Sequence, residues 1–185
     1  MEKVVGIIII VVIIVLIGKI ISIYNNLIKR RNRVDNAWAQ IDVQLQKRFD
    51  LIPNLMETVK GAAKYERETL ESIIAARNSY NSATSSDDKI DINNSTEKLF
   101  NRLFALHESY PDLKANNNYM KFMDSLSKIE EQISVSRLFY NDTVNLYNDE
   151  LMIFPNNIIA GLFRFKDAKL LKAAENAREN IKVQF

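Results

Sequence analysis

The sequence is most informative in what it has little of: 185 residues include no cysteine, one histidine, three prolines and four glycines. Without cysteine there is no disulfide framework, no thiolate nucleophile and no zinc site built on sulfur. The same absence is compatible with the cytosol and with an extracytoplasmic compartment. Because few glycines and prolines interrupt the chain, and strand signals are nearly absent beyond the N-terminus, the sequence predicts an all-α fold.

Charge of either sign is not in excess. The chain has 25 lysine and arginine residues against 23 aspartate and glutamate residues, for a net charge of +2. Nothing in this balance indicates nucleic acid as a partner. The length allows one modest domain plus an anchor.

Patterns that carry catalysis are missing as well. The one histidine, His107, cannot supply the paired Glu-x-x-His motifs of a di-iron bundle or a His-Glu-x-x-His zinc site. There is no Gly-x-Ser-x-Gly and no glycine-rich phosphate loop. Glu130 and Glu131 are adjacent, so on a helix they point about 100° apart and do not form an acid–base pair. We therefore expect no catalytic residue, no cofactor and no metal ion, and a protein that is not an enzyme.

The apolar run at the N-terminus predicts a membrane-spanning helix. Residues 4–24, which begin with Val4 and end with Tyr24, match the roughly 20 residues that a helix needs to cross the hydrocarbon core. Lys19 falls in the last turns, where its ammonium group can reach the headgroups, and Tyr24 suits the interface. A cleaved signal peptide would need a small-x-small cleavage site, which does not follow the run, and a buried strand would be shorter. We predict a single-pass anchor in the cell membrane.

Flanking charge predicts the orientation of this anchor. The N-terminal side offers Lys3, offset by Glu2, whereas the other side is rich in lysine and arginine. Because such residues are retained on the cytoplasmic face, we expect the short N-terminus outside and the domain in the cytoplasm. The basic cluster is also a candidate for contacts with anionic lipid headgroups, at about 1 kcal/mol per charge. Its members are Lys29, Arg30, Arg31 and Arg33.

The anchor is predicted to continue into the first helix of the domain. Apolar residues recur there at spacings of three and four, and Arg48 takes one slot of this stripe. Pro53 lacks an N–H and clashes with the preceding turn, so it must kink or break the helix. Because the stripe keeps its register on both sides, we favour a kink over a reversal of the chain. The stripe consists of Val34, Trp38, Ile41, Leu45, Ile52, Leu55 and Val59.

The rest of the chain predicts further helices around two interruptions. Apolar faces of this kind are buried only against each other, so we expect an antiparallel up-and-down bundle of four helical segments. The predicted order is a helix near 70–77, a polar loop over about 81–95, a helix from Thr96, an interruption at 109–118, a helix over 116–154 ended by Pro155, and a tail over 155–185. We divide the chain into residues 1–24, the N-terminus and anchor, and residues 25–185, the helical domain.

The sequence allows two interpretations each for Trp38 and for the aromatic tail patch. Trp38 is expected to anchor the core, with partner binding as the alternative. The aromatic tail patch either packs under the bundle or lies in the membrane interface. If Pro53 reverses the chain, four antiparallel elements return Phe154 to the membrane, whereas a kink leaves three elements and places it far away. The tail patch consists of Ile158, Ile159, Leu162, Phe163 and Phe165, with Arg164 and Lys166 interleaved.

Several motifs taken together resemble the LemA family of bacterial membrane proteins, in an order that covers nearly the whole chain. They are YNNLIKRRNRVDNAWAQIDVQLQKRFDLIPNLMETVKGAAKYE, ESYPDLKAN, FYNDTVNLYND and FPNNIIAGLF. The resemblance implies one N-terminal membrane helix with its N-terminus outside, followed by a four-helix bundle, and it implies no established activity. By that resemblance the signature positions are Asn32, Trp38, Asp42, Arg48, Asp50, Pro53, Asn54, Tyr110, Pro111, Asp112, Tyr140, Asn141 and Pro155.

These observations favour a membrane-anchored interaction or scaffolding module with protein partners. The alternative is a protein that binds or remodels the membrane surface through its basic cluster and aromatic tail, and an enzyme is the third possibility. Asp42, Arg48 and Asp50 allow two interpretations, either a transverse Asp–Arg network between helices or a groove that recognises a partner segment. The sequence does not separate the two.

Overall fold

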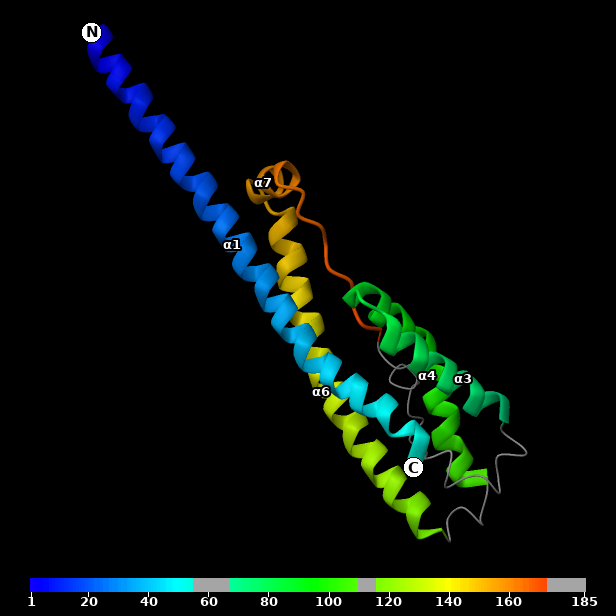
Figure 1. Cartoon of the computed structure of the whole chain (residues 1–185). Coiled ribbons are helices and arrows are strands. Elements are labelled where there is room, and N and C mark those ends of the chain that lie inside the picture. Colours follow the sequence, from blue (N-terminus) through cyan, green and yellow to red (C-terminus); the bar gives the residue numbers. More distant parts are fainter. Residues whose placement is uncertain (55–66, 110–115, 173–185) are drawn as a thin grey trace, which may run out of the picture.

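A computed structural model describes residues 1–54, 67–109 and 116–172 and is helical throughout, apart from short connections and one extended segment. The prediction of an all-α bundle is confirmed (Figure 1). The helices are α1 (Glu2–Asp50), α3 (Arg67–Ser82), α4 (Ser86–Ser109), α6 (Asn117–Met152) and α7 (Asn156–Leu162).

Helix α1 is one uninterrupted helix of 49 residues that contains both the apolar run and the first helix of the bundle. At 1.5 Å per residue it is about 74 Å long. The proposed boundary between residues 24 and 25 falls inside this helix, so the division into two domains stays a prediction. The helix ends at Asp50, and the C-cap residue Leu51 is still in the right-handed helical region.

The preference for a kink at Pro53 is wrong. Pro53 lies in one further helical turn after the end of α1. Helix α3 then runs back in the opposite direction to α1, so the chain has reversed between the two helices (Figure 1). The stripe continued through Pro53 in sequence, but its continuation at Leu55 and Val59 lies outside the described residues.

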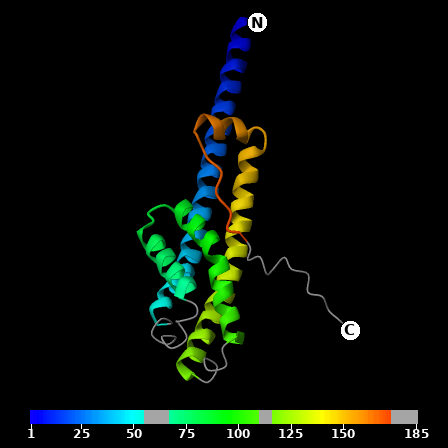
Figure 2. The same ribbon diagram turned by 90° about the vertical axis from the view of Figure 1, so that its right-hand side faces the viewer.

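The four long helices alternate in direction along the chain. Helices α1 and α6 form a long antiparallel pair, and the α3–α4 hairpin covers the part of this pair farthest from the apolar run (Figure 2). The core contains a cluster of rings in which the Phe49 centroid lies 4.8 Å from that of Tyr80 and 5.7 Å from that of Phe100. Side chains buried along this pair of helices include Ile41, Leu45, Leu126, Ile133 and Val144.

The prediction of a polar loop over residues 81–95 is wrong. Helix α3 continues to Ser82 and α4 begins at Ser86, so only three residues connect them. The Ser85 hydroxyl accepts a hydrogen bond from the Asp88 N–H at 3.0 Å, which caps the start of α4. The segment is polar in composition, but Ile90, Asn93 and Glu97 are buried at helical spacing. Ile90 joins the apolar core, whereas Asn93 and Glu97 face Arg48.

Helix α6 agrees with the predicted helix over 116–154 to within two residues at its C-terminal end. The Asn116 side chain accepts hydrogen bonds from the N–H groups of Asn118 at 3.0 Å and Tyr119 at 3.3 Å. This is an N-cap, which satisfies two of the free donors of the first turn. The helix ends at Met152, ahead of Pro155.

Beyond α6 the chain turns across the end of the bundle and then runs back along α6. Helix α7 ends in a Schellman turn, because the Phe165 N–H bonds to the Ala160 carbonyl at 2.9 Å and the Arg164 N–H bonds to the Gly161 carbonyl at 3.2 Å. Arg164 takes the left-handed position of this turn, with φ of 57°. Residues 165–172 follow as an extended segment, which we call the strap (Figure 1).

Candidate functional site

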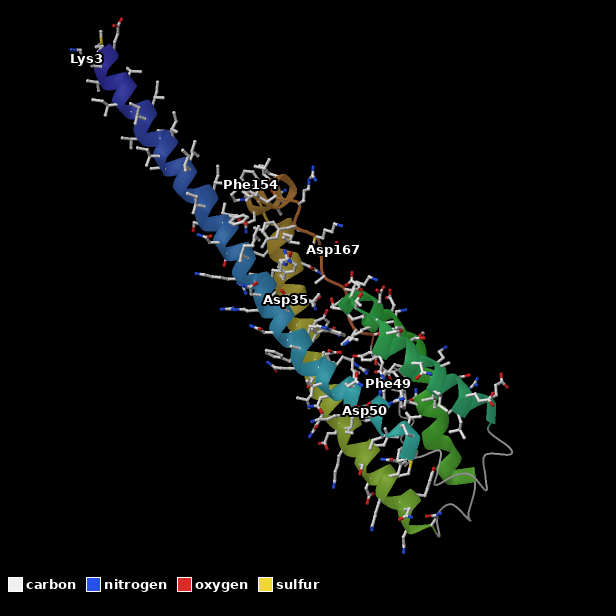
Figure 3. The ribbon with its side chains drawn as sticks, in the orientation of Figure 1. Lys3, Asp35, Phe49, Asp50, Phe154 and Asp167 are labelled. Atoms are coloured by element: carbon white, nitrogen blue, oxygen red, sulfur yellow. The ribbon has the colours of Figure 1, made fainter. Side chains whose placement is uncertain are left out.

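The first part of α1 is a candidate membrane span by length and composition. The described residues hold one helix of this kind, and none of its apolar window is buried by the rest of the protein. Apolar side chains project from it on every side, without neighbours from the bundle (Figure 3). A helix that is apolar all round is typical of a segment surrounded by lipid or by other protein.

A second apolar surface lies where the apolar run of α1 meets the bundle. We call it the α7 patch, and it is formed by the end of α6, by α7 and by the Schellman turn. Helix α7 buries Ile159 and Ala160 towards the bundle, while the residues of the patch are 49–76% exposed. Figure 3 shows Phe154 at this junction. The α7 patch consists of Met152, Ile153, Phe154, Ile158, Leu162 and Phe163.

Tyr24 fixes the position of the α7 patch against α1. Its ring centroid lies 4.8 Å from that of Phe163 and 5.8 Å from that of Phe165. Asn26, two residues further along, donates a hydrogen bond to Glu150 at 2.7 Å. The aromatic tail therefore packs partly against the bundle and leaves an apolar surface exposed beside the end of the predicted span, while its place in the membrane interface stays a prediction.

The basic cluster lies on α1 just beyond this level. Lys29, Arg31 and Arg33 are exposed and Arg30 is half-buried. Their contact with lipid headgroups stays a prediction.

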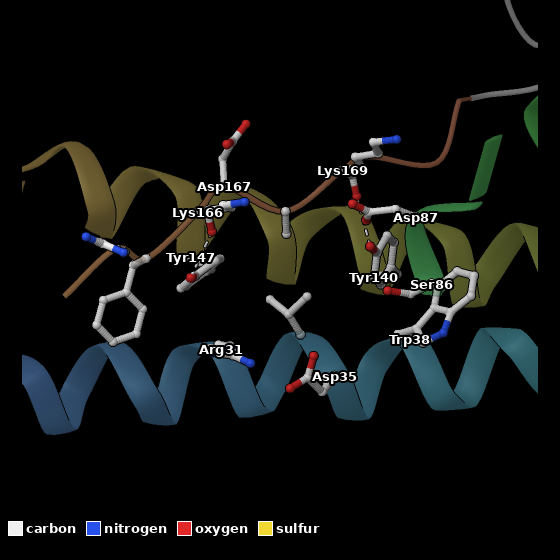
Figure 4. A pocket seen from close by; sticks show the side chains of 14 residues that line it. Arg31, Asp35, Trp38, Ser86, Asp87, Tyr140, Tyr147, Lys166, Asp167 and Lys169 are labelled. Atoms are coloured by element: carbon white, nitrogen blue, oxygen red, sulfur yellow. Dashed lines mark hydrogen bonds between the residues drawn. The ribbon is translucent and has the colours of Figure 1, made fainter. Parts of the chain in front are cut away.

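Trp38 is half-buried and packs on the strap side of the α1–α6 pair. Its ring meets that of Tyr140 edge to face, with centroids 5.8 Å apart. A pocket of about 350 Å³ opens between these rings, Tyr147, the start of α4 and the strap (Figure 4). The core role expected of Trp38 is therefore only partial, because one side of the indole faces a cavity.

Four side chains of α6 hold the backbone of the strap. Asn148 donates to the carbonyl of Ala168 at 3.0 Å and accepts from its N–H at 2.9 Å. Asn141 forms the same pair with Leu171, at 2.8 Å to the carbonyl and 3.0 Å from the N–H. These two asparagines, with the two tyrosines that precede them, form what we call the clamp.

The tyrosines of the clamp add two more bonds to the strap. The Tyr140 hydroxyl donates to the Lys169 carbonyl at 2.8 Å, and the Tyr147 hydroxyl donates to the Lys166 carbonyl at 3.0 Å (Figure 4). Burial raises the pKa of Tyr140 from 10.0 to about 12, with the carboxylates of Asp87 and Asp35 adding to the effect. Tyr140 therefore stays protonated, and can donate this bond, at neutral pH.

Contacts to α4 complete the attachment of the strap. Lys169 bonds to Asp91 at 2.7 Å, which raises the pKa of this lysine. The Lys172 N–H donates to Asn94 at 3.0 Å, and the Leu171 side chain is buried. The strap thus links α6 to α4.

The sequence identified only half of the clamp. Tyr140 and Asn141 were signature positions with no assigned role, and Tyr147 and Asn148 were not singled out. The signal was present, because Tyr-Asn-Asp occurs twice in FYNDTVNLYND at a spacing of seven residues. That spacing is two helical turns, which places both pairs on one face of α6.

Arg48 is fully buried, as its place in the apolar stripe predicted. It donates to Glu130 at 3.1 Å and to Asn93, and it lies 3.7 Å from Glu97, which is itself paired with Arg137. These groups come from α1, α4 and α6. The sequence suggested an Asp–Arg network between helices, but the acidic partners of Arg48 are Glu130 and Glu97.

Asp42 and Asp50 join α1 to the hairpin. Asp42 accepts a hydrogen bond from the Tyr80 hydroxyl at 2.6 Å and pairs with Lys89 at 2.9 Å. Burial, with the bond to Asp42, raises the pKa of Tyr80 well above its ordinary value. Asp50, which is largely exposed, lies 3.8 Å from Arg77 (Figure 3). Both carboxylates thus have basic partners within the protein.

The remaining signature positions do not form one site. Asn32 is exposed on α1, Pro53 and Asn54 are exposed beyond its end, and Pro155 precedes α7. Tyr110, Pro111 and Asp112 lie outside the described residues. Across residues 1–54, 67–109 and 116–172, no three histidine, aspartate or glutamate side chains are grouped as metal ligands.

The outer face of α6 carries a row of exposed apolar side chains, which we call the α6 row. Its members recur at helical spacing and are 54–67% exposed. The row lies on the face of α6 opposite to buried Val144 and Tyr140. It consists of Val135, Leu138, Phe139 and Leu146.

The described residues thus define a helical-bundle protein that carries one candidate membrane-spanning helix. Residues 37–185 match the LemA family, and the chain belongs to that family. Protein LemA of Metamycoplasma hominis is 24% identical over 158 residues, which are 85% of this chain and 72% of that relative. Magnetosome proteins MamQ 2 and MamQ 1 of Paramagnetospirillum magneticum are each 35% identical over 68 residues, which are 37% of this chain and 25% of each relative.

Proposed function

We propose that this LemA family protein is a membrane-anchored, non-enzymatic interaction module that holds a helical scaffold at the cytoplasmic surface of the cell membrane. The observation that carries this proposal is the continuity of α1, which passes from the apolar run into the core of the bundle without a break. A scaffold of this kind needs a fixed relation to its membrane, and one helix supplies it. The clamp side of the bundle and the α6 row are then the two faces on which protein contacts are expected.

The α6 row supports the interaction half of the proposal. Single exposed apolar residues are ordinary on protein surfaces, but four of them on one helix face, around the exposed Asp142, form a candidate contact surface. Because these side chains are more than half exposed, they do not contribute to the core of the bundle. We assign the row to the apolar face of a partner's helix.

Site-specific photo-cross-linking in native membranes tests this assignment. A photoreactive residue at Leu138 is expected to give discrete adducts, whereas the same residue at Asn78, exposed on the polar face of α3, is expected to give none. Equal yields at the two positions, or no adduct at Leu138 across independent membrane preparations, would count against the interaction function.

A second candidate function is binding or remodelling of the membrane surface, which the α7 patch favours. Six exposed apolar side chains beside the end of the span, with exposed cations on the next turns of α1, have the composition of an interfacial segment. In this case α7 lies in the headgroup region, and the patch faces the acyl chains.

Depth-dependent fluorescence quenching in vesicles tests the second function. The chain has no cysteine, so a single Leu162→Cys or Phe154→Cys variant can carry a fluorophore. Quenchers attached to the lipid chains are expected to quench both labels, but not a label at Leu138→Cys on the outer face of α6. Equal quenching of all three labels, or of none, would contradict an interfacial α7.

A further inference from the structure

We propose that the clamp is a binding groove for an extended peptide segment of a partner protein, with a small residue and a leucine three positions apart, and that the strap is its resident ligand. This proposal rests on the interaction function and names the segment that the module would recognise. The strap occupies the groove in cis, so binding of a partner requires its displacement.

The geometry of the groove matches any extended backbone. Asn141 and Asn148 are seven residues apart on α6, about 10.5 Å along the helix axis. Their ligands Ala168 and Leu171 are three residues apart, about 10 Å in an extended strand. The two tyrosines repeat the same relation with Lys166 and Lys169. The helix therefore presents polar groups at the repeat of an extended chain.

The hydrogen bonds between the clamp and the strap all involve backbone atoms of the strap. Each asparagine offers one donor and one acceptor to the same residue, as a neighbouring strand would do. The recognition is therefore that of strand addition, with side chains of a helix in place of a sheet edge. The groove can discriminate between ligand sequences at the two positions whose backbone the asparagines hold.

Side-chain exposure along the strap defines this preference. Lys166, Asp167 and Leu170 are exposed, so the groove does not select their side chains, whereas the exposed Lys169 pairs with Asp91 of α4. Ala168 is half-buried and Leu171 is only 2% exposed. A ligand therefore needs a small residue, then a residue for which Asp91 favours a cation, then an unrestricted residue, then leucine. Proline is excluded at both held positions because each donates its N–H to an asparagine.

The surroundings of the strap make its displacement measurable. The pocket of about 350 Å³ beside Trp38 is lined by strap residues on one side, so it opens when the strap leaves. Trp38 is the single tryptophan of the chain, and its fluorescence reports on this pocket. The strap stays linked to α7, so a partner competes with a tethered ligand whose effective concentration is of millimolar order.

The test uses the full chain in detergent micelles and a fluorescein-labelled peptide FKDAKLLK, the sequence of residues 165–172. Two chain variants weaken the resident strap and leave the clamp intact. Ala168→Pro removes the N–H that Asn148 accepts, and Leu171→Asp removes the buried anchor. Both variants are expected to bind the peptide at least about tenfold more tightly than the unaltered chain, and the peptide is expected to shift their Trp38 emission.

Matched controls separate a specific groove from general adhesion. Adding Asn141→Ala and Asn148→Ala to the Ala168→Pro chain is expected to abolish peptide binding. A peptide with proline in place of its alanine is expected not to bind, and one with serine in place of both Lys166 and Asp167 is expected to bind as the parent does. Circular dichroism melting establishes that each variant keeps its fold.

The proposal is overturned if both strap variants are folded and bind the peptide no more tightly than the unaltered chain. It is also overturned if loss of the two asparagines leaves peptide binding unchanged. Cross-linking from Leu138 uses the opposite face of α6. Persistent adducts at Leu138 together with a failed peptide would remove this inference alone, whereas absence of those adducts would remove the proposed function itself.

Discussion

The guanidinium carbon of Arg48 lies 4.0 Å from the centroid of the Phe100 ring, with no part of Arg48 exposed to solvent. The ring covers one face of the cation, while Glu130 and Asn93 accept hydrogen bonds from its two terminal nitrogens. Arg48 therefore joins three helices by both polar and aromatic contacts. Such a group stabilises the bundle only while its partners stay complete.

Arg48→Ala is expected to lower the free energy of unfolding by about 3–5 kcal/mol, because it leaves buried carboxylate and amide groups without their cation. Arg48→Lys is expected to recover little, since an ammonium cannot reproduce the planar fork. Urea unfolding in detergent, followed by Trp38 fluorescence, measures both. Arg33→Ala, at an exposed position of the same helix, is the control and should change stability by less than about 0.5 kcal/mol. A loss below about 1 kcal/mol for Arg48→Ala would contradict the cluster.

Tyr140 gives the protein a specific alkaline limit. Its pKa is about 12 when folded and 10.0 ordinarily, so the folded state favours the protonated phenol. The stability contributed by this difference is present below pH 10 and is lost as the pH rises from 10 to 12. Between pH 9 and 11.5 the unaltered chain is expected to lose about 2 kcal/mol more than Tyr140→Phe. Equal losses in urea titrations at the two pH values would contradict this assignment.

Arg164→Gly is expected to stabilise the bundle by about 0.5–1 kcal/mol. Arg164 occupies a left-handed backbone position, where a Cβ atom is unfavourable and glycine is not. Arg164→Val is the matched control and is expected to destabilise, because a branched side chain fits this conformation worst. Thermal melting by circular dichroism ranks the three chains, and the order glycine, arginine, valine is the expected result.

Asn148→Ala is expected to loosen the strap. It removes two hydrogen bonds to Ala168, each contributing about 1 kcal/mol. Tryptic cleavage after Lys169, followed by mass spectrometry, should then be about tenfold faster or more. Asn145→Ala, at an exposed position on the same helix, is the control and should leave the rate unchanged. Equal rates in the two variants would show that Asn148 does not hold the strap.

The cytoplasmic placement of the domain can be tested with one cysteine at Thr84, between α3 and α4. Thr84 is exposed, and its replacement leaves the capping hydroxyl of Ser85 in place. A membrane-impermeant thiol reagent is expected to label Thr84→Cys only after the cells are permeabilised. Labelling in intact cells would reverse the orientation and confine partners to the cell envelope.

Much of the fold follows from patterns that extend over many residues. The stripe through Ile41 and Leu45 and the long helix that ends ahead of Pro155 were predicted because buried positions repeat along a helix. The apolar run was predicted from its length and composition. Arg48 was also assigned correctly to the buried face of α1, because its position in the stripe was a better guide than its charge. Resemblance to the LemA family supplied the four-helix arrangement.

The failures arose where composition was a poor guide to environment. The segment that begins α4 was taken for a loop because it is rich in serine, asparagine and aspartate. Its inward positions are polar because they face Arg48, Arg137 and Asp42, which only the packed structure brings together. The reversal beyond Pro53 was missed because a preserved register cannot distinguish a bent helix from two separate helices.

The clamp could not have been predicted from any one segment of the sequence. Its ligand is an extended stretch that has no periodicity of its own, and its bonds connect side chains to backbone across 19 to 30 residues of sequence. The repeated Tyr-Asn pair predicts a polar face on α6, but not what that face holds.

The unbroken course of α1 also fixes the distance between the end of the apolar run and the core of the bundle. From Tyr24, at the end of the apolar run, to Arg48, in the core, the helix rises about 36 Å. If the run spans the bilayer, the core around Arg48 is held about that far beyond the end of the run, whereas the turn between α3 and α4, beside Trp38, lies nearer to the membrane. A partner that meets the bundle at the level of Arg48 must itself extend several nanometres from the membrane, or approach from solution.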